Sequence, residues 1–280
     1  MKRISTQAAI VLAVISLSDV AFGSSYVSGG LGYVVPSQSP SLTVNSSNAT
    51  FVPTTPGASV FNLPNVNWKN SFNNGYELIL AAGMDVNQSL RGEAELLFMS
   101  MQRSINGSYG WMQVTPIGGD VIATTQGNPI SKTTSTLYSY SLIANLYYDF
   151  KNTTHWTPFV GVGAGLGRVH AGGTTGNSTL VINDVTTGLS ATFPTVEHTP
   201  ALNGIVFVWQ FKAGVDYAVS KTVSVGAQYR RFRTSSYNIN SGNITVNPGT
   251  ATTAIFTTPS RAVSGLTNNS IDLIVRYNFA

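Results

Sequence analysis

Three histidines, His155, His170 and His198, are the side chains of this sequence best suited to acid–base or metal chemistry. A nucleophilic triad needs a histidine held close to a serine and a carboxylate on rigid elements. Glu197 and His198 are sequence neighbours, and on an extended strand their side chains would point to opposite faces. The chain has no cysteine, and no two of its histidines have the spacing of a ligand pair. We therefore predict no catalytic residue, no metal site and no cofactor.

A glycine series is the second candidate motif, at Gly161, Gly163, Gly165 and Gly167. A dinucleotide-binding loop requires a glycine-rich turn that leads into a helix. Here the glycines recur at every second position, and no helical pattern follows. Alternate glycines remove the side chains from one face of a strand, which leaves room for long side chains opposite. The series therefore predicts a structural role.

Charged residues are only 9% of the chain, against about 25% in an ordinary soluble domain. Where apolar and polar residues alternate, most of these charges fall on the polar face. Seven acids and four bases share that face, namely Glu77, Asp85, Glu93, Glu95, Asp149, Asp216 and Asp272 with Arg91, Lys212, Arg230 and Arg276. A charge in a dry interior is costly unless it is paired. We therefore expect salt bridges, forming either a structural plug or the gate of a thin water path.

The main ionic cluster is predicted at mid-height, where Arg230, Asp272 and Lys212 meet. Lower layers are predicted to contain Glu93, Glu95 and Arg276. The complete predicted cluster is Arg230, Asp272, Lys212, Glu93, Glu95, Arg276, Asp216 and Glu77.

The elements that position these charges are strands, because the pattern has a period of two residues. Near the C-terminus, Ile271, Leu273 and Val275 alternate with Asp272 and Arg276. The apolar faces are large and aromatic, whereas the opposite faces mix glycine with isolated charges. A soluble barrel places its apolar face inside. The reverse arrangement favours a barrel in lipid, apolar outside and polar inside.

Eight segments have this pattern, at about 25–35, 74–85, 90–103, 136–150, 156–170, 205–218, 222–235 and 269–279. Long connections at 36–73, 104–135, 171–204 and 236–268 alternate with short ones at 86–89, 151–155 and 219–221. Short turns on one side and long loops on the other are typical of outer-membrane barrels. We predict an all-β fold, an eight-stranded antiparallel transmembrane β-barrel with short periplasmic turns and four long extracellular loops. Ten or more spanning strands are the alternative.

Short hairpins are predicted within three of the long loops. They pair 42–44 with 50–52, 111–114 with 121–124, and 180–184 with 190–193. These segments are rich in threonine, which suits a lipid-facing surface poorly. We expect them to stand above the membrane.

Residues 1–23 have the pattern of a secretory signal peptide. Lys2 and Arg3 precede a ten-residue, largely apolar stretch, and small residues precede a cleavage point after Gly23. The stretch is too short to span a bilayer as a helix. The barrel domain is therefore expected to comprise residues 24–280.

The overall charge is +4, from 15 basic and 11 acidic residues. Basic residues are too sparse for a nucleic-acid-binding stripe, so no nucleic-acid partner is expected. Arg231 and Arg233 are predicted to point outward near the extracellular end of their strand. A guanidinium group can donate two parallel hydrogen bonds to one phosphate. Because lipopolysaccharide carries phosphates at the level of the outer leaflet, these two residues are candidate contacts for it.

The sequence resembles the small OmpA-type and Opa-like outer-membrane barrel families. The resemblance covers residues 25–279 and is carried by Tyr26–Tyr33 (YVSGGLGY), Thr157–Gly167 (TPFVGVGAGLG), Phe211–Tyr217 (FKAGVDY) and Val275–Phe279 (VRYNF). It implies a bacterial outer-membrane location, contact with outer-membrane lipid, and the barrel-assembly machinery as a partner during biogenesis. That machinery is thought to read a terminal aromatic residue, whereas here Ala280 follows Phe279. Larger OmpA-type proteins carry a peptidoglycan-binding domain after the barrel, and this sequence gives no expectation of one.

Three functions remain open at this point. The favoured one is a non-enzymatic surface anchor whose loops meet host or surface ligands. The second is a narrow, low-conductance channel gated by the internal salt bridges. The third and most remote is an outer-membrane barrel enzyme.

Overall fold

The computed structural model describes residues 24–38, 41–45, 60–62, 65–109, 112–115, 123–125, 129–184, 190–199, 201–239, 242–246, 254–258 and 261–279. The predicted signal peptide lies outside these residues, and its prediction stays untested. In the described parts of the chain, no helix is long and apolar enough to cross a membrane.

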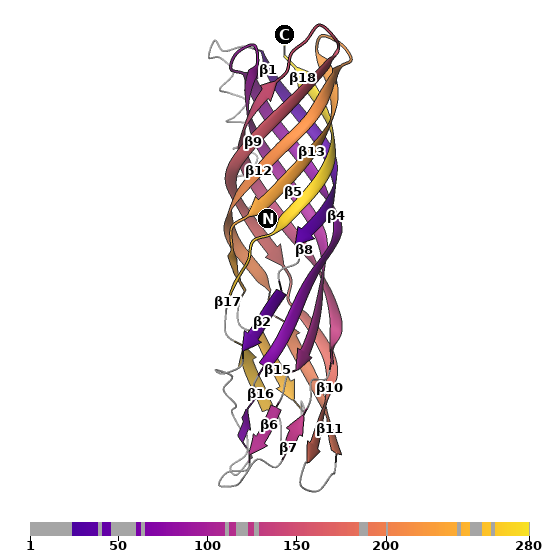
Figure 1. The fold of residues 1–280 in the computed structure, drawn as a ribbon, viewed down its shortest axis with the longest axis vertical. Helices are drawn as coiled ribbons and strands as arrows, with labels where there is room; N and C mark the ends of the chain where they lie inside the picture. The colour runs from indigo at the N-terminus through magenta and orange to yellow at the C-terminus, as the bar shows by residue number, and fades with distance from the viewer. Residues whose placement is uncertain are drawn as a thin grey trace, which may run out of the picture.

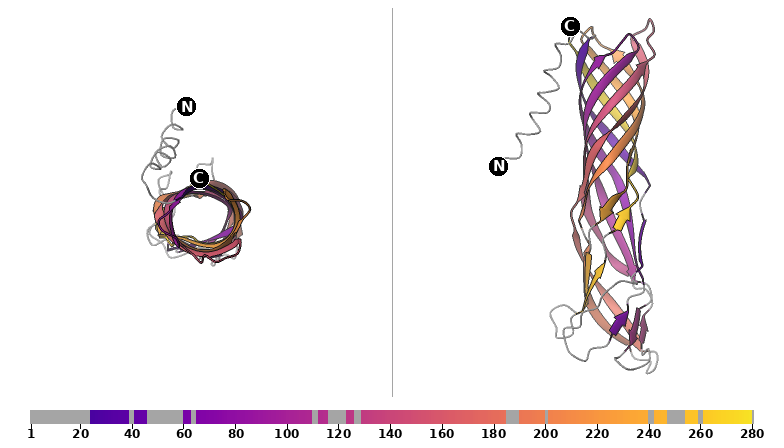
Figure 2. Two further views of the ribbon diagram at one scale, coloured as in Figure 1. Left: turned by 90° about the horizontal axis from the view of Figure 1, so that it is seen from above. Right: turned by 90° about the vertical axis from the view of Figure 1, so that its left-hand side faces the viewer.

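Eight long strands form a closed antiparallel barrel (Figures 1 and 2). They are β1 (Ser25–Gln38), β4 (Asn65–Asp85), β5 (Leu90–Tyr109), β8 (Pro129–Asp149), β9 (Trp156–Ala171), β12 (Leu202–Ala218), β13 (Val223–Thr234) and β18 (Thr267–Asn278). Each strand pairs with its neighbours in chain order, and β18 pairs with β1 to close the ring. The predicted eight-stranded fold is confirmed. Three strands, β4, β5 and β8, extend well beyond their predicted extracellular ends.

The two faces of the strands differ as the alternation predicts. On β18, Leu273 is 69% exposed on the outside, whereas its neighbour Asp272 is fully buried inside. Val225 on β13 and Phe211 on β12 also face outward. The outer wall is therefore a band of aliphatic and aromatic side chains suited to lipid.

The short turns are fixed by local side-chain hydrogen bonds. In the turn after β4, Asn87 Oδ1 accepts from the backbone N–H groups of Ser89 and Leu90. In the turn before β13, Ser220 Oγ accepts from the N–H groups of Thr222 and Val223. Asn and Ser favour such turns because their short polar side chains can replace a backbone partner. All three turns lie at the end that is uppermost in Figure 1.

The opposite, extracellular end carries additional strands (Figure 1). A second, seven-stranded sheet has the order β16 (Ala254–Thr258), β15 (Gly242–Val246), β11 (Ser190–Thr199), β10 (Thr174–Asp184), β7 (Ala123–Thr125), β6 (Met112–Thr115) and β3 (Val60–Asn62). Three short strands join the barrel sheet instead, namely β2 (Ser41–Asn45), β14 (Tyr237–Ile239) and β17 (Arg261–Val263).

Two of the three predicted hairpins are confirmed, since β6 pairs with β7 and β10 pairs with β11. The first prediction stays untested, because its predicted partner, residues 50–52, lies outside the described residues. Strand β2 pairs with residues 65–69 of β4, which continues past the membrane and offers a regular edge.

The topology can be tested with single cysteines, because the natural chain has none. Gln88→Cys replaces an exposed side chain in a short turn. Gly172→Cys lies beyond β9, where an added Cβ meets nothing within 4 Å. On intact cells, a membrane-impermeant maleimide should label the variant at position 172 and spare the variant at 88. Permeabilising the outer membrane should expose both. Labelling at 88 before permeabilisation would reverse the orientation.

Candidate functional site

The barrel lumen is the candidate site, and glycines on β9 create space in it. A Cβ at Gly161 would lie 2.4 Å from a ring carbon of Tyr147, and one at Gly163 would lie 1.9 Å from Asn145 Oδ1. Tyr147 and Asn145 of β8 occupy the space that these glycines leave empty. The prediction that these glycines have a structural role, leaving room for larger side chains, is confirmed.

Arg230 of β13 is the centre of the first group of contacts. Its Nε lies 3.1 Å from Asp272 Oδ2 and 3.4 Å from Glu77 Oε1. Its NH1 lies 2.8 Å from Glu95 Oε1 across the lumen. All four side chains are buried. The guanidinium thus joins β13 to β18, β4 and β5.

Glu95 connects Arg230 to the second cation. Lys212 Nζ donates to Glu95 Oε2 and lies 3.8 Å from Glu93 Oε1. The predictions that Glu93 and Glu95 belong to lower layers were therefore wrong. The strands of a barrel are tilted and their register is staggered. Two residues that are the same number of positions from the periplasmic ends of their strands can therefore lie at different heights along the barrel axis. We call Glu77, Glu93, Glu95, Lys212, Arg230 and Asp272 the central ionic layer.

A second layer lies nearer the periplasm. Arg91 Nε contacts Asp149 Oδ1 at 3.0 Å, and Arg91 NH2 lies 3.4 Å from Asp216 Oδ2. Arg276 NH2 shares the same Asp216 oxygen at 2.8 Å. We call Arg91, Asp149, Asp216 and Arg276 the periplasmic ionic layer. Asp85, also predicted to face inward, is only partly buried and belongs to neither layer.

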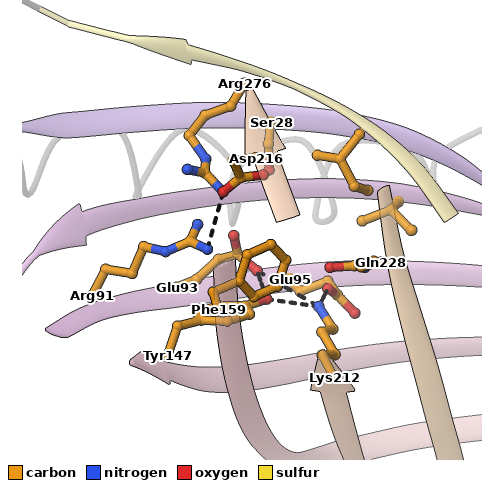
Figure 3. A pocket seen from close by; sticks show the side chains of 12 residues that line it. Ser28, Arg91, Glu93, Glu95, Tyr147, Phe159, Lys212, Asp216, Gln228 and Arg276 are labelled. Atoms are coloured by element: carbon orange, nitrogen blue, oxygen red, sulfur yellow. Dashed lines mark hydrogen bonds and ion pairs between the residues drawn. The ribbon is translucent and has the colours of Figure 1, made fainter. Parts of the chain in front are cut away.

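A cavity of about 10 Å³ separates the two layers (Figure 3). Cations and carboxylates line it from both sides, together with Ser28, Tyr147 and Phe159. This volume is about that of one water-sized sphere. The described lumen therefore contains no wide aqueous path at this level.

On the extracellular side of the central layer, most inward side chains are apolar, and buried polar ones such as Asn268 and Arg103 lie among them. Met99 and Met101 follow Glu95 on the inward face of β5, and Phe232 follows Arg230 on β13. We call Val34, Met99, Met101, Leu137, Val169, Val206, Val208 and Phe232 the apolar plug, and each is at most 1% exposed. From the sequence we predicted a polar interior and not this plug. The signal was present, since the same alternation that places Glu95 inward also places Met99 inward.

Neutral polar side chains complete the central layer, and sequence reasoning missed them too. Tyr26 and Tyr147 donate their hydroxyl groups to the two oxygens of Glu93, at 3.0 and 2.7 Å. Gln210 donates to Glu95 at 3.1 Å. The same alternation that places the charged residues inward also places these side chains inward. Arg103, further along β5, is likewise buried and was not predicted.

Tyr237 of β14 lies beyond the membrane-spanning part of the barrel. Burial raises the pKa of its hydroxyl to about 12, and the nearby Arg103 acts in the opposite direction. The phenol therefore stays protonated at physiological pH.

The three histidines lie apart from this network. His155 is exposed in a short turn, with its ring 6.0 Å from that of Tyr217. His170 faces outward on β9. His198 of β11 has its Nδ1 3.1 Å from Thr175 Oγ1. Among the described residues, no three histidine or acidic side chains are grouped so that they could hold a metal ion.

Arg231 and Arg233 lie on the outer face of β13 and are exposed. Their cross-strand neighbours on β12 are Phe211 and Trp209, which are 40% and 39% exposed. Within the described residues, neither arginine has an ion-pair partner, whereas Arg91, Lys212, Arg230 and Arg276 inside the lumen are all paired.

Residues 5–279 match the family described as outer membrane protein beta-barrel domain. The chain belongs to this family. Its place is the bacterial outer membrane, as the closed barrel and its lipid-facing wall require.

Several solved structures are similar to this outer-membrane barrel. Neisserial surface protein A matches 91% of this chain and 97% of its own, with 15% identity and a TM-score of 0.39. OprG from Pseudomonas aeruginosa matches 92% and 96%, with 9% identity and a TM-score of 0.43. The outer membrane protease OmpT from Escherichia coli matches 91% and 97%, with 10% identity and a TM-score of 0.40. A search of curated protein sequences finds no match.

The central ionic layer of this outer-membrane barrel should contribute measurably to stability. Arg230→Ala leaves Glu77, Glu95 and Asp272 underpaired, and breaking a buried pair costs about 3–5 kcal/mol. We expect a loss of that size in the free energy of unfolding, measured by urea denaturation in lipid vesicles. Arg231→Ala is the matched control, because Arg231 is the next residue and faces outward. Equal effects of the two substitutions would contradict a special role for the layer.

Proposed function

We propose that the protein is a non-conducting anchor that displays a β-rich surface structure outside the cell. The apolar plug is the observation that carries this proposal. Its fully buried side chains lie in the lumen on the extracellular side of two layers of paired charges. An ion crossing the barrel would have to shed its water in the plug and displace buried salt bridges.

The displayed part is the extracellular sheet. Strands β10 and β11 form its longest hairpin, with ten paired positions from Thr174–Thr199 to Asn183–Ser190. Loops on a rigid scaffold are common binding surfaces. We propose that this sheet and its connections mediate surface interaction or adhesion.

A narrow, gated channel is the second candidate. One observation favours it: Glu95 is shared by Lys212 and Arg230, which lie on different strands. A carboxylate with two cationic partners can keep one while it releases the other. The water-sized cavity next to this contact adds local space.

We further propose that the protein is not an enzyme, although the similar OmpT is a protease. The contacts of the histidines support this proposal. His198 contacts a threonine hydroxyl, and His155 lies against a tyrosine ring. The His198–Thr175 contact is exposed to solvent, and a histidine that activates a hydroxyl needs a third group to orient it.

Single-channel recording in a planar lipid bilayer separates the anchor from the channel. We expect no conductance steps from the refolded wild-type barrel. Arg230→Ala should also be silent, because the apolar plug remains above the altered layer. Conductance steps in the wild type would favour the channel, and steps that appear only in Arg230→Ala would show that the ionic layer alone is the gate.

Adhesion tests the displayed sheet directly. Cells displaying the protein should be retained on epithelial monolayers or on polystyrene better than cells with the empty vector. Replacing residues 175–198 by a short turn removes most of the β10–β11 hairpin but no residue of the barrel strands. This variant should lose most of the retention at equal surface level. Full retention by the shortened variant would contradict an adhesive role for the hairpin.

Arg231 and Arg233 are proposed to bind lipopolysaccharide phosphates at the outer leaflet. Their exposed guanidinium groups stand beside Trp209 and Phe211, so a phosphate and an acyl chain can be contacted together. The double variant Arg231→Gln and Arg233→Gln should retain several-fold less lipopolysaccharide per barrel after detergent extraction. Lys151→Gln with Lys221→Gln removes the same charge from exposed turns at the other end and should retain the normal amount. Equal retention by both double variants would reject the contact.

A further inference from the structure

Two buried carboxyl groups of the central ionic layer have too few hydrogen-bond donors. Glu77 accepts from Ser270 Oγ at 2.7 Å, and its Oε1 lies 3.4 Å from Arg230 Nε. Asp272 accepts from Gln228 Nε2 at 2.8 Å and from Arg230 Nε at 3.1 Å, both at Oδ2. Glu77 Oε2 and Asp272 Oδ1 have no partner within the described residues. Both side chains are fully buried, so each free oxygen is costly.

The other two acids of the central ionic layer, Glu93 and Glu95, have enough hydrogen-bond donors. Glu95 is surrounded by donors, from Lys212, Arg230, Gln210 and Asn145. Glu93 receives two tyrosine hydroxyls and the Asn145 amide. Donors on both oxygens stabilise the ionised form. The deficiency is therefore confined to Glu77 and Asp272.

These two carboxyl groups are brought together over one glycine. Gly32 of β1 pairs with Asp272 on one side and with Glu77 on the other. A Cβ at Gly32 would lie 2.2 Å from Asp272 Oδ1 and 2.8 Å from Glu77 Cγ. Arg230 Nε lies 3.1 Å from Asp272 Oδ2 and 3.4 Å from Glu77 Oε1, so one guanidinium contacts both carboxyl groups. Two ionised carboxylates can only accept hydrogen bonds, so neither can satisfy the free oxygen of the other unless one of them carries a proton.

The net charge of the central ionic layer also favours a proton on one of the two carboxyl groups. Glu77, Glu93, Glu95 and Asp272 carry four negative charges when ionised, against two positive charges on Lys212 and Arg230. The periplasmic layer has two of each sign and offers no compensation. Two like charges in one buried site cannot both be held at low cost.

We propose that Glu77 and Asp272 form a proton-binding site in which one proton is shared between the two carboxyl groups. The proton is taken from water as the barrel folds. It converts one of the two acceptors into a donor and reduces the excess negative charge of the layer from two to one. The charged groups that face the site are Arg230 of β13, which contacts both carboxyls, and Glu95 of β5, which contacts Arg230. This inference does not depend on the proposed anchoring function.

The matched substitutions Glu77→Gln and Glu95→Gln test the proposal. Glutamine is a neutral, donor-bearing replacement for a protonated glutamate. We expect Glu77→Gln to leave the urea midpoint of the refolded barrel near the wild-type value. Glu95→Gln should lower the midpoint clearly, because it removes an ionised partner of two cations. The opposite ranking would overturn the proposal.

Infrared spectroscopy gives a direct readout. The wild-type barrel in lipid at neutral pH should show the C=O stretching band of a protonated carboxylic acid, with its shift in D2O. The band should be absent in Glu77→Gln and also in Asp272→Asn, whose amide can donate to Glu77. It should persist in Glu95→Gln if that variant folds. A wild-type barrel without the band, or a band that survives both Glu77→Gln and Asp272→Asn, would overturn the proposal.

A metal cation is the competing occupant. If sodium chloride stabilises the wild type more than choline chloride does, and Glu77→Gln abolishes the difference, the site binds a cation instead of a proton. Equal midpoints in the two salts are expected for a shared proton.

Discussion

The absence of water from the bilayer core is the constraint on which this structure depends. Every backbone N–H and C=O in the membrane must be satisfied by the protein itself, and a closed antiparallel ring achieves this with strands. The pairing of β18 with β1 completes the ring. Once the ring is closed, the wall has a lipid face and a lumen face, and alternate residues on every strand must serve opposite environments. An eight-stranded barrel is just wide enough for its own side chains to fill. The inward residues therefore form a core whose contents decide what the barrel can do.

That core has two chemically different parts. Paired charges occupy the periplasmic and central levels, and mostly apolar side chains, with the buried Asn268 and Arg103 among them, occupy the extracellular level. The charges are tied together across the lumen, since Arg230 joins four strands and Arg91 contacts residues of β8 and β12. The apolar plug resembles the interior of a soluble protein. Exclusion of water by the plug strengthens the electrostatic contacts below it and raises the cost of any charge left without a partner.

The sequence predicted the strands and their facing because both follow from a local period of two residues. Asp272 inside and Leu273 outside could be assigned without knowing any neighbour. Contacts across the lumen could not, because they depend on the stagger of the whole ring. Glu93 and Glu95 were therefore placed at the wrong level, although their inward facing was correct. The apolar plug was missed for another reason: inward charges were counted, whereas inward methionines and valines were read as part of a polar face. The pairing of β2 with β4 depends on how far β4 continues, and polar residues such as Asn67 and Lys69 gave no sign of a strand there.

The length of the strands has a mechanical consequence. β8 has 21 residues, which at about 3.4 Å per residue gives a contour of about 70 Å. Even with a tilt of about 40°, this is roughly twice the height of the apolar band of an outer-membrane barrel. About half of the strand therefore extends beyond the membrane as a hydrogen-bonded continuation of the barrel wall. Such an extension holds its outer end at a fixed distance from the lipid headgroups. A force applied to that end is transmitted along the hydrogen-bonded strands to the barrel wall. A contact made at the far end would be borne by the whole ring of strands and not by a flexible tether.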